Sequence, residues 1–188
     1  ETLNLEVDLK FKHEFTCESH RGKQKLLNKS YPDSGPMFPD TKYMGDYRVW
    51  DLRNQSDKVD VPTNIDLLMA GFSCKNLSSL TRDRRTVTDK GGSTGSTLDG
   101  VLRYLGRHKP RAVLLENVRG VMQKDQMTAL KKLLHNKGYH GGGVAVNSMD
   151  YLLPQSRHRV YMFFVRNSNT AYEPKAIETL KQFKCAQH

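Results

Sequence analysis

Residues 93–117, STGSTLDGVLRYLGRHKPRAVLLEN, place a helical pattern directly before a buried strand. In residues 93–108 the apolar side chains recur at helical spacing, and Pro110 stands just beyond the expected helix end. Residues 112–115 form an uninterrupted apolar run, which is typical of a strand inside a sheet. This helix–strand unit favours an α/β fold.

The same alternation extends outward from this unit. Residues 64–70 (NIDLLMA) end at Gly71 and predict another strand, buried on both faces. Residues 31–39 and 73–92 have the composition of loops, and Gly138 is expected to cap a helix. We therefore predict a doubly wound α/β fold, with a mostly parallel sheet and helices on both faces. The remaining expected elements are strands at 9–17, 144–146 and 160–165 and helices at 21–29, 121–137 and 173–184.

Composition limits the classes of protein to consider. The chain has 188 residues, 37% of them hydrophobic, and a net charge of +10, which suits one basic domain with a nucleic-acid partner. No apolar run reaches the roughly 18 residues of a membrane helix, and no secretory leader is visible. The cysteines at 17, 74 and 185 are too scattered for a disulfide framework or a metal cluster. We expect an intracellular protein with no metal and no membrane partner.

Nucleophilic, acidic and basic residues follow or precede the predicted strands. Cys74 comes just after residues 64–70, and the cations that follow it favour the nucleophilic thiolate. Glu116 follows residues 112–115, and Arg157 and Arg159 alternate just before residues 160–165. Each alone is compatible with a plain structural role. Because ligands of open α/β folds bind at the carboxyl ends of strands, the combination indicates a catalytic site.

Three motifs in this order resemble those of the DNA cytosine-5 methyltransferase family. GFSCK at 71–75, ENV at 116–118 and QSRHR at 155–159 are similar to the family's G-F-P-C-Q, E-N-V and Q-x-R-x-R. Upstream, HEFTCES at 13–19 resembles the family's second strand with its acidic end. The resemblance covers nearly the whole chain, and it implies a Rossmann-like class I methyltransferase that uses S-adenosylmethionine.

The resemblance also implies roles for the catalytic residues. Cys74 would add to carbon 6 of a flipped-out cytosine, which activates carbon 5 toward the methyl group. Glu116 would act at ring nitrogen 3, Arg159 at the carbonyl oxygen, and Arg157 nearby on a phosphate or the loop. The expected substrate is double-stranded DNA, with phosphates contacted by the cations of residues 73–92, namely Lys75, Arg82, Arg84 and Arg85.

Further residues match the family's cofactor-binding positions. Glu18 would bind the ribose hydroxyls, and Asp46, in the Gly45-Asp46 pair, would lie near the adenine amino group. Phe72, Ser73 and Leu98 would line the cofactor pocket, with simple core packing as the alternative for these three.

The chain departs from the family pattern at several points. Ser73 replaces the usual proline and Lys75 the usual glutamine. The glycine-rich cofactor loop is expected before residue 1, and the target-recognition region and last motifs after residue 188, so residues 1–188 are expected to be a partial catalytic domain. A tRNA cytosine-5 methyltransferase and an inactive homologue that binds nucleic acid remain alternatives. The expected compartment is the nucleus in a eukaryote, or the cytoplasm and nucleoid in a prokaryote.

Overall fold

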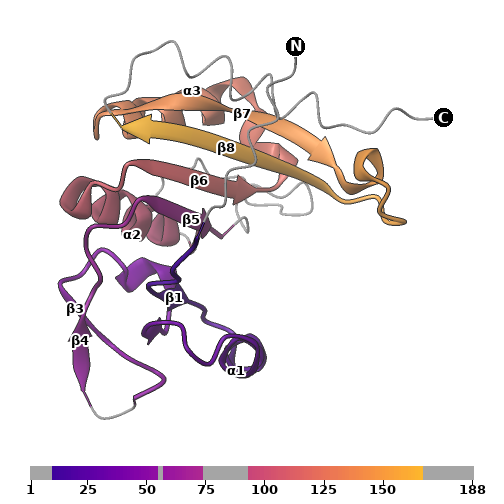
Figure 1. Cartoon of the computed structure of the whole chain (residues 1–188). Helices are drawn as coiled ribbons and strands as arrows, with labels where there is room; N and C mark the ends of the chain where they lie inside the picture. The colour runs from indigo at the N-terminus through magenta and orange to yellow at the C-terminus, as the bar shows by residue number, and fades with distance from the viewer. Residues whose placement is uncertain (1–9, 55–56, 74–92, 167–188) are drawn as a thin grey trace.

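The computed structural model describes residues 10–54, 57–73 and 93–166 (Figure 1). Its largest element is a four-stranded sheet with the order β5-β6-β8-β7. The strands are β5 (Leu67–Gly71), β6 (Ala112–Asn117), β7 (Tyr139–Asn147) and β8 (His158–Arg166). The expected loop at 74–92 and helix at 173–184 lie outside the described residues.

The four-stranded sheet is mixed rather than mostly parallel. β5 and β6 are parallel, as expected for strands joined through a crossover helix. β8 runs antiparallel to both β6 and β7. The physical reason is the short link between β7 and β8, which holds only the single turn η3 (Ser148–Tyr151) and suits a hairpin rather than a crossover.

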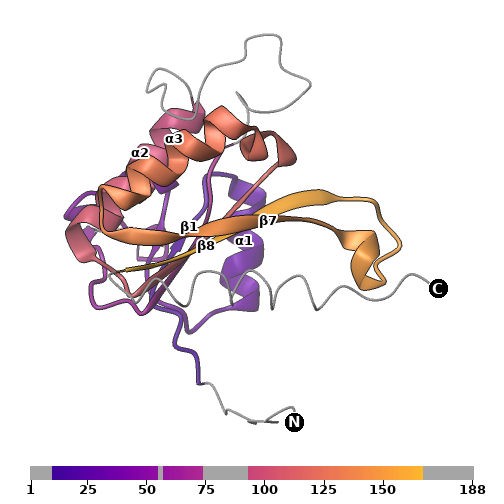
Figure 2. The same ribbon diagram turned by 90° about the horizontal axis from the view of Figure 1, so that it is seen from above.

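Two helices cover one face of this sheet. α2 (Ser93–His108) has the predicted bounds, and α3 (Lys124–His135) lies beside it in Figure 2. The predicted helix at 121–137 is interrupted, because Gln123 adopts ψ 135° between the turn η2 (Arg119–Met122) and α3. The C-cap of α3 is Asn136 rather than the predicted Gly138, which lies two residues further on with φ 82°. The apolar sides of α2 and α3 build the core against buried sheet residues such as Val113, Leu115, Met162 and Phe164.

A smaller unit precedes the sheet. β1 (Thr16–Cys17) pairs in parallel with β2 (Met37–Phe38), and α1 (Arg21–Ser30) connects them. The turn η1 (Thr41–Tyr43) and an antiparallel pair follow, β3 (Arg48–Trp50) with β4 (Lys58–Asp60). The helix expected at 21–29 is confirmed. The strand expected at 9–17 is confirmed only in its last two residues, and β2 lies inside the expected loop at 31–39.

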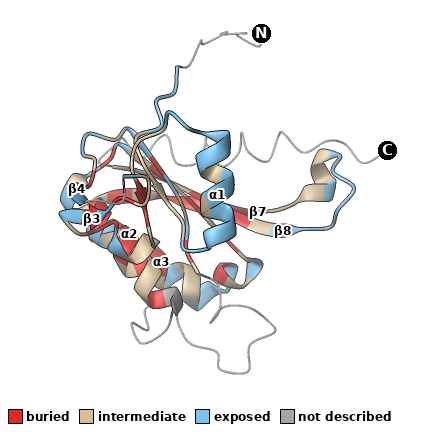
Figure 3. Ribbon diagram, turned by 90° about the horizontal axis from the view of Figure 1, so that it is seen from below, coloured by how far each residue is buried: buried red, intermediate tan, exposed pale blue. Residues whose placement is uncertain are grey.

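The prediction that residues 64–70 form a strand buried on both faces is wrong. Leu68 is 4% exposed, but Leu67 and Met69 on the other face are 38% and 68% exposed. The reason is that β5 is the outer strand of the sheet within the described residues, and that α2 and α3 cover one face (Figure 3). No helix in residues 10–54, 57–73 and 93–166 is long and apolar enough to cross a membrane.

β7 begins at Tyr139, earlier than the expected start at residue 144, and includes three consecutive glycines. A Cβ on Gly141 would lie 2.0 Å from the carbonyl oxygen of Phe163 on β8. The close approach of the two strands therefore requires glycine here, and the glycines serve the hairpin instead of weakening it.

Two glycines of α2 provide a matched test of this packing. A Cβ on Gly100 would lie 2.3 Å from the Thr41 carbonyl oxygen, whereas a Cβ on Gly106 would meet the flexible end of Lys137 at 3.1 Å. We expect Gly100→Ala to lower the free energy of unfolding by about 1–3 kcal/mol, because the clash with η1 outweighs the gain in helix propensity. We expect Gly106→Ala to be neutral or to stabilise by up to about 1 kcal/mol. Urea unfolding of both variants checks this, and equal effects would contradict the close packing of α2 on η1.

Candidate active site

The pairing of β6 with β8 brings together two of the predicted catalytic residues. The register places Glu116 opposite Tyr161 and Asn117 opposite Val160. Arg159, the residue before Val160, directs its Nε to Glu116 Oε1 at a distance of 2.8 Å. Both side chains are partly exposed, at 23% for Arg159 and 37% for Glu116, so the pair orients the two groups more than it stabilises the fold.

The parallel pairing of β5 with β6 places Glu116 beside the strand end that leads toward Cys74. Gly71 is opposite Glu116 in the register, and a Cβ on Gly71 would lie 3.2 Å from Glu116 Oε2. The Glu116 carboxylate therefore lies against the backbone where β5 ends.

Two side chains hold the backbone that follows β5. Asn117 is 2% exposed, and its Nδ2 donates to the carbonyl oxygen of Phe72 at 3.0 Å while its Oδ1 accepts from the Val118 N–H at 2.8 Å. On the other side, the Ser73 N–H donates to Thr97 Oγ1 of α2 at 2.9 Å. Residues 72 and 73 are thus clamped from β6 and from α2.

Sequence reasoning missed both clamping residues. The available signal for Asn117 was its place after an apolar strand, where a buried amide needs hydrogen-bond partners. Thr97 carried no comparable signal, because its partner lies in a different segment of the chain.

Arg157 occupies a different environment from Arg159. It precedes β8 and is exposed, and its backbone N–H donates to Asn147 Oδ1 at 2.9 Å and to Ser148 Oγ at 3.1 Å. Arg159 also donates from Nη1 to the His158 carbonyl oxygen. The structure therefore unites Arg159 with Glu116, whereas the Arg157 backbone anchors the link between β7 and β8.

Two carboxylates follow the parallel strands β1 and β2. Glu18 comes directly after β1, and its Oε1 accepts from the His20 N–H at 2.8 Å. Asp40 follows β2 and caps η1, with Oδ1 accepting from the Lys42 N–H at 2.9 Å. Because β1 and β2 are parallel, both carboxylates lie at the same edge.

Cys17 lies between these strand ends and is not a nucleophile candidate. Its burial, with a contribution from the negative charge of Asp40, raises the pKa of the thiol to about 12. A thiol in this state stays protonated and inert, as expected for a structural cysteine that is partly buried against the core. The same interaction shows that Asp40 lies close to β1.

Asp46, the acid expected near the adenine, forms an ion pair with Arg103 of α2. Arg103 donates to Asp46 and to Asp99 and also to the Lys42 carbonyl oxygen. The hydrogen bond with Asp46 is the main reason that the pKa of Arg103 is raised. Asp40 therefore follows the end of β2 as Glu18 follows the end of β1, whereas Asp46 lies after η1. Sequence reasoning missed Asp40 because β2 was not recognised.

The other expected cofactor residues differ in exposure. Phe72 and Leu98 belong to the hydrophobic core, at 5% and 1% exposed, and Ser73 is half-buried. Within the described ranges, no three His, Cys, Asp or Glu side chains are grouped as metal ligands. The remaining predicted residues lie outside the described part of the chain: Cys74, Lys75, Arg82, Arg84 and Arg85.

Solved structures share this fold at low sequence identity. The S. pombe Dnmt2 methyltransferase matches with a TM-score of 0.54 and 17% identity, over 95% of this chain and 57% of that one. The Spodoptera frugiperda DNMT2 mutant matches with a TM-score of 0.57 and 15% identity, over 83% and 43%. These likenesses establish the Rossmann-like methyltransferase fold.

Sequence comparison agrees with the fold. The chain is 27% identical over 180 residues to the DNA (cytosine-5-)-methyltransferase DMT5 of Cryptococcus neoformans, covering 95% of this chain but 7% of that protein. It is 29% identical over 147 residues to the type II methyltransferase M.HpaII of Haemophilus parainfluenzae, covering 74% and 40%. The chain thus spans less than half of either relative.

A family model extends these pairwise matches. The model described as C-5 cytosine-specific DNA methylase matches residues 39–188, which include the ends of β5 and β6 and the Glu116–Arg159 pair. This chain belongs to the C-5 cytosine-specific DNA methylase family.

Proposed function

We propose that the protein transfers a methyl group from S-adenosylmethionine to carbon 5 of cytosine in double-stranded DNA. The observation that carries this proposal is the Glu116–Arg159 pair, held against Gly71 at the strand end from which the chain continues to Cys74. Family membership supports the same chemistry.

The pair suits recognition of a cytosine ring. Arg159 is a multiple donor and can serve the carbonyl oxygen of the base, while Glu116 holds a hydrogen bond or a proton at ring nitrogen 3. The 2.8 Å contact between them keeps both groups turned to one place. Residues from two adjacent strands thus contact the carbonyl group and nitrogen 3 of the same ring.

Cys74 supplies the nucleophile in this proposal. Its thiolate forms a bond to carbon 6, and the electron pair of the 5,6 double bond moves to carbon 5 as the ring gains a proton or hydrogen bond at nitrogen 3. S-adenosylmethionine, when bound, supplies the methyl group that carbon 5 takes up. Loss of the proton from carbon 5, elimination of the thiolate and return of the nitrogen 3 proton to Glu116 then restore the double bond and the neutral base. The Asn117 and Thr97 clamps hold residues 72 and 73, directly before Cys74.

The donor and acceptor groups on this chain fit the cofactor. Glu18 and Asp40 present carboxylate oxygens at one strand edge, where they can accept from ribose hydroxyls and from an adenine amino group. Ser73, after the end of β5, would add a polar contact, and Phe72 and Leu98 belong to the apolar core. Lys75, Arg82, Arg84 and Arg85 would contact DNA phosphates, in line with the net charge of +10.

Covalent trapping tests the proposal directly. We expect full-length protein incubated with S-adenosylmethionine and duplex DNA containing 5-fluorocytosine to form an adduct that survives denaturing electrophoresis. Cys74→Ser should abolish the adduct, Glu116→Gln should slow its formation by about 10²–10⁴-fold, and Cys185→Ser should leave it unchanged. An adduct on tRNA but not on DNA would move the substrate to RNA, and none on either would identify an inactive homologue.

The cofactor side separates Asp40 from Asp46. We expect Asp40→Ala to weaken S-adenosylmethionine binding by roughly 10–100-fold, since a hydrogen bond to a charged group is lost. Asp46→Ala should change the affinity by less than about threefold, because Arg103 already occupies that carboxylate. Isothermal titration calorimetry measures both, with thermal unfolding as the check on integrity. A larger loss for Asp46→Ala would restore the original assignment.

The clamp on Phe72 makes a separate prediction. Asn117→Ala leaves a buried carbonyl oxygen without its donor, so we expect a loss of about 1–3 kcal/mol in unfolding free energy and slower adduct formation. Asn136→Ala, at an exposed position after α3, is the matched control for both measurements. Unchanged trapping kinetics in Asn117→Ala would show that the clamp is only structural.

A further inference from the structure

The helix α1 is exposed along its whole length. None of its residues is buried, and only Gln24 and Leu27 are half-buried. In Figure 3 the helix stands apart from α2 and α3, and most of its surface is exposed. A ten-residue helix with so little apolar packing gains little stability from the core. Its outer side chains are therefore available to a partner.

The charged residues of α1 are all basic. They are Arg21, Lys23, Lys25 and Lys29, and the helix contains no acidic residue. Lys23 Nζ lies 3.9 Å from Glu18 Oε2. Among the described residues, the side chains of Arg21, Lys25 and Lys29 form no hydrogen bond or ion pair. Three of these cations therefore have no neutralising carboxylate within that part of the chain.

These three cations lie in a line along the helix. Because they are spaced by four positions, they fall within about 80° of the helix circumference, on a different side from Gln24 and Leu27. Successive members are about 6 Å apart along the axis, and the line is about 12 Å long. We call Arg21, Lys25 and Lys29 the α1 cationic stripe.

The α1 cationic stripe is unfavourable for the helix that carries it. Like charges four positions apart repel each other, and Arg21 lies in the first turn, at the positive end of the helix dipole. No acidic residue stands in this turn, and the His20 side chain makes no capping hydrogen bond. A bound polyanion would relieve both effects.

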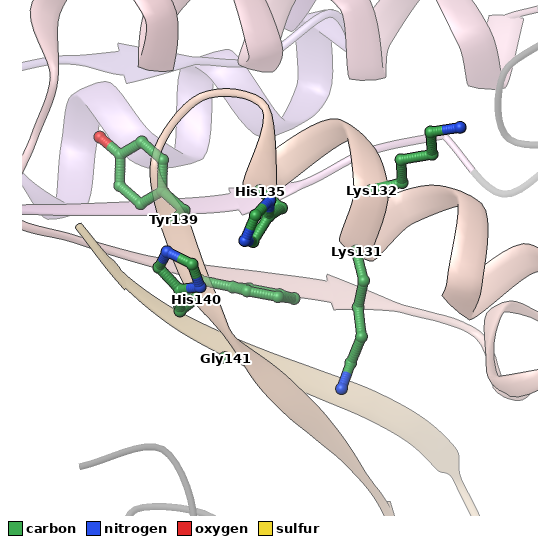
Figure 4. A pocket seen from close by; sticks show the side chains of 7 residues that line it. Lys131, Lys132, His135, Tyr139, His140 and Gly141 are labelled. Atoms are coloured by element: carbon green, nitrogen blue, oxygen red, sulfur yellow. The ribbon is translucent and has the colours of Figure 1, made fainter. Parts of the chain in front are cut away.

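The lysines of α3 are arranged differently. Asp125 lies in the first turn of this helix and offsets part of its charge, and no three cations of α3 are spaced by four positions. In Figure 4 Lys131 and Lys132 extend in different directions beside a cavity that His135 helps to line. The α3 lysines therefore match the stripe in charge type but not in geometry.

We propose that the α1 cationic stripe binds the phosphate backbone of duplex DNA, outside the candidate active site. Each strand of the duplex carries one phosphate per 3.4 Å of axis, so the stripe spans about three to four phosphates. Such contacts position DNA without reading its bases. The net charge of +10 agrees with a polyanionic partner, and the choice of DNA among polyanions rests on the proposed function.

The salt dependence of DNA binding tests this proposal. Fluorescence anisotropy of a labelled duplex of mixed sequence, titrated with the full chain, gives the association constant K at each salt concentration. Each neutralised phosphate contributes about 0.9 to the magnitude of the slope of log K against log[salt]. We expect the triple variant Arg21→Gln, Lys25→Gln, Lys29→Gln to lower this magnitude by about 2–3. At about 0.1 M salt, binding should weaken by about 100-fold.

The matched control is the triple variant Lys124→Gln, Lys132→Gln, Lys137→Gln, which loses the same number of positive charges. It should keep the wild-type slope, because these lysines do not form a stripe. Neither variant should lower the unfolding temperature, since every substituted residue is exposed.

The measurement needs neither S-adenosylmethionine nor Cys74, so its outcome is separate from that of covalent trapping. An unchanged slope in the α1 variant, or an equal decrease in the control variant, would overturn the proposal. Polyglutamate that binds the wild-type chain as tightly as the duplex, at equal charge, would also overturn it and would assign the stripe to an acidic protein.

Discussion

The pairing of β6 on both of its edges is the constraint on which the candidate site depends. On one edge the parallel register with β5 sets Gly71 beside Glu116, and on the other the antiparallel register with β8 brings Arg159 to the same carboxylate. A shift of one residue in either register would turn these side chains to the opposite face of the sheet. The backbone hydrogen bonds of one central strand therefore hold in place groups that come from three distant segments.

The polar contacts around β6 position side chains and contribute little to the free energy of folding. The Glu116–Arg159 pair is partly exposed, so solvent screens much of its energy. The Asn117 amide differs because it is buried and makes hydrogen bonds through both its oxygen and its nitrogen. Together with Thr97, it connects the strand that carries Glu116 and the helix α2 to the backbone before Cys74.

The acidic residues near the smaller unit have different partners. Asp46 and Asp99 share Arg103 and fasten η1 to α2, so they serve the packing of the smaller unit. Asp40 follows β2 as Glu18 follows β1, and the parallel pairing of these short strands places both at one edge. The family resemblance assigns Asp46 to the adenine, whereas the pairing of β1 with β2 makes Asp40 a second candidate.

Sequence periodicity predicted the elements whose apolar pattern is long or uninterrupted, such as α2 with its full bounds and the cores of β6 and β8. It failed for β2, since two apolar residues among prolines carry no periodic signal, and for the start of β7, since glycine's role at Gly141 depends on how closely β8 approaches. It also could not predict the exposure of Leu67 and Met69, which depends on which face the helices cover.

By itself the sequence determined the α/β class and the family motifs, and it predicted Glu116 and Arg159 as catalytic residues, because these depend on local pattern and on residue chemistry. Only the tertiary structure decided that the sheet is mixed, that Arg159 and not Arg157 meets Glu116, and that Asp40 and Glu18 follow two paired parallel strands. These outcomes depend on strand pairing and register, which are set by hydrogen bonds between segments that are far apart in the chain.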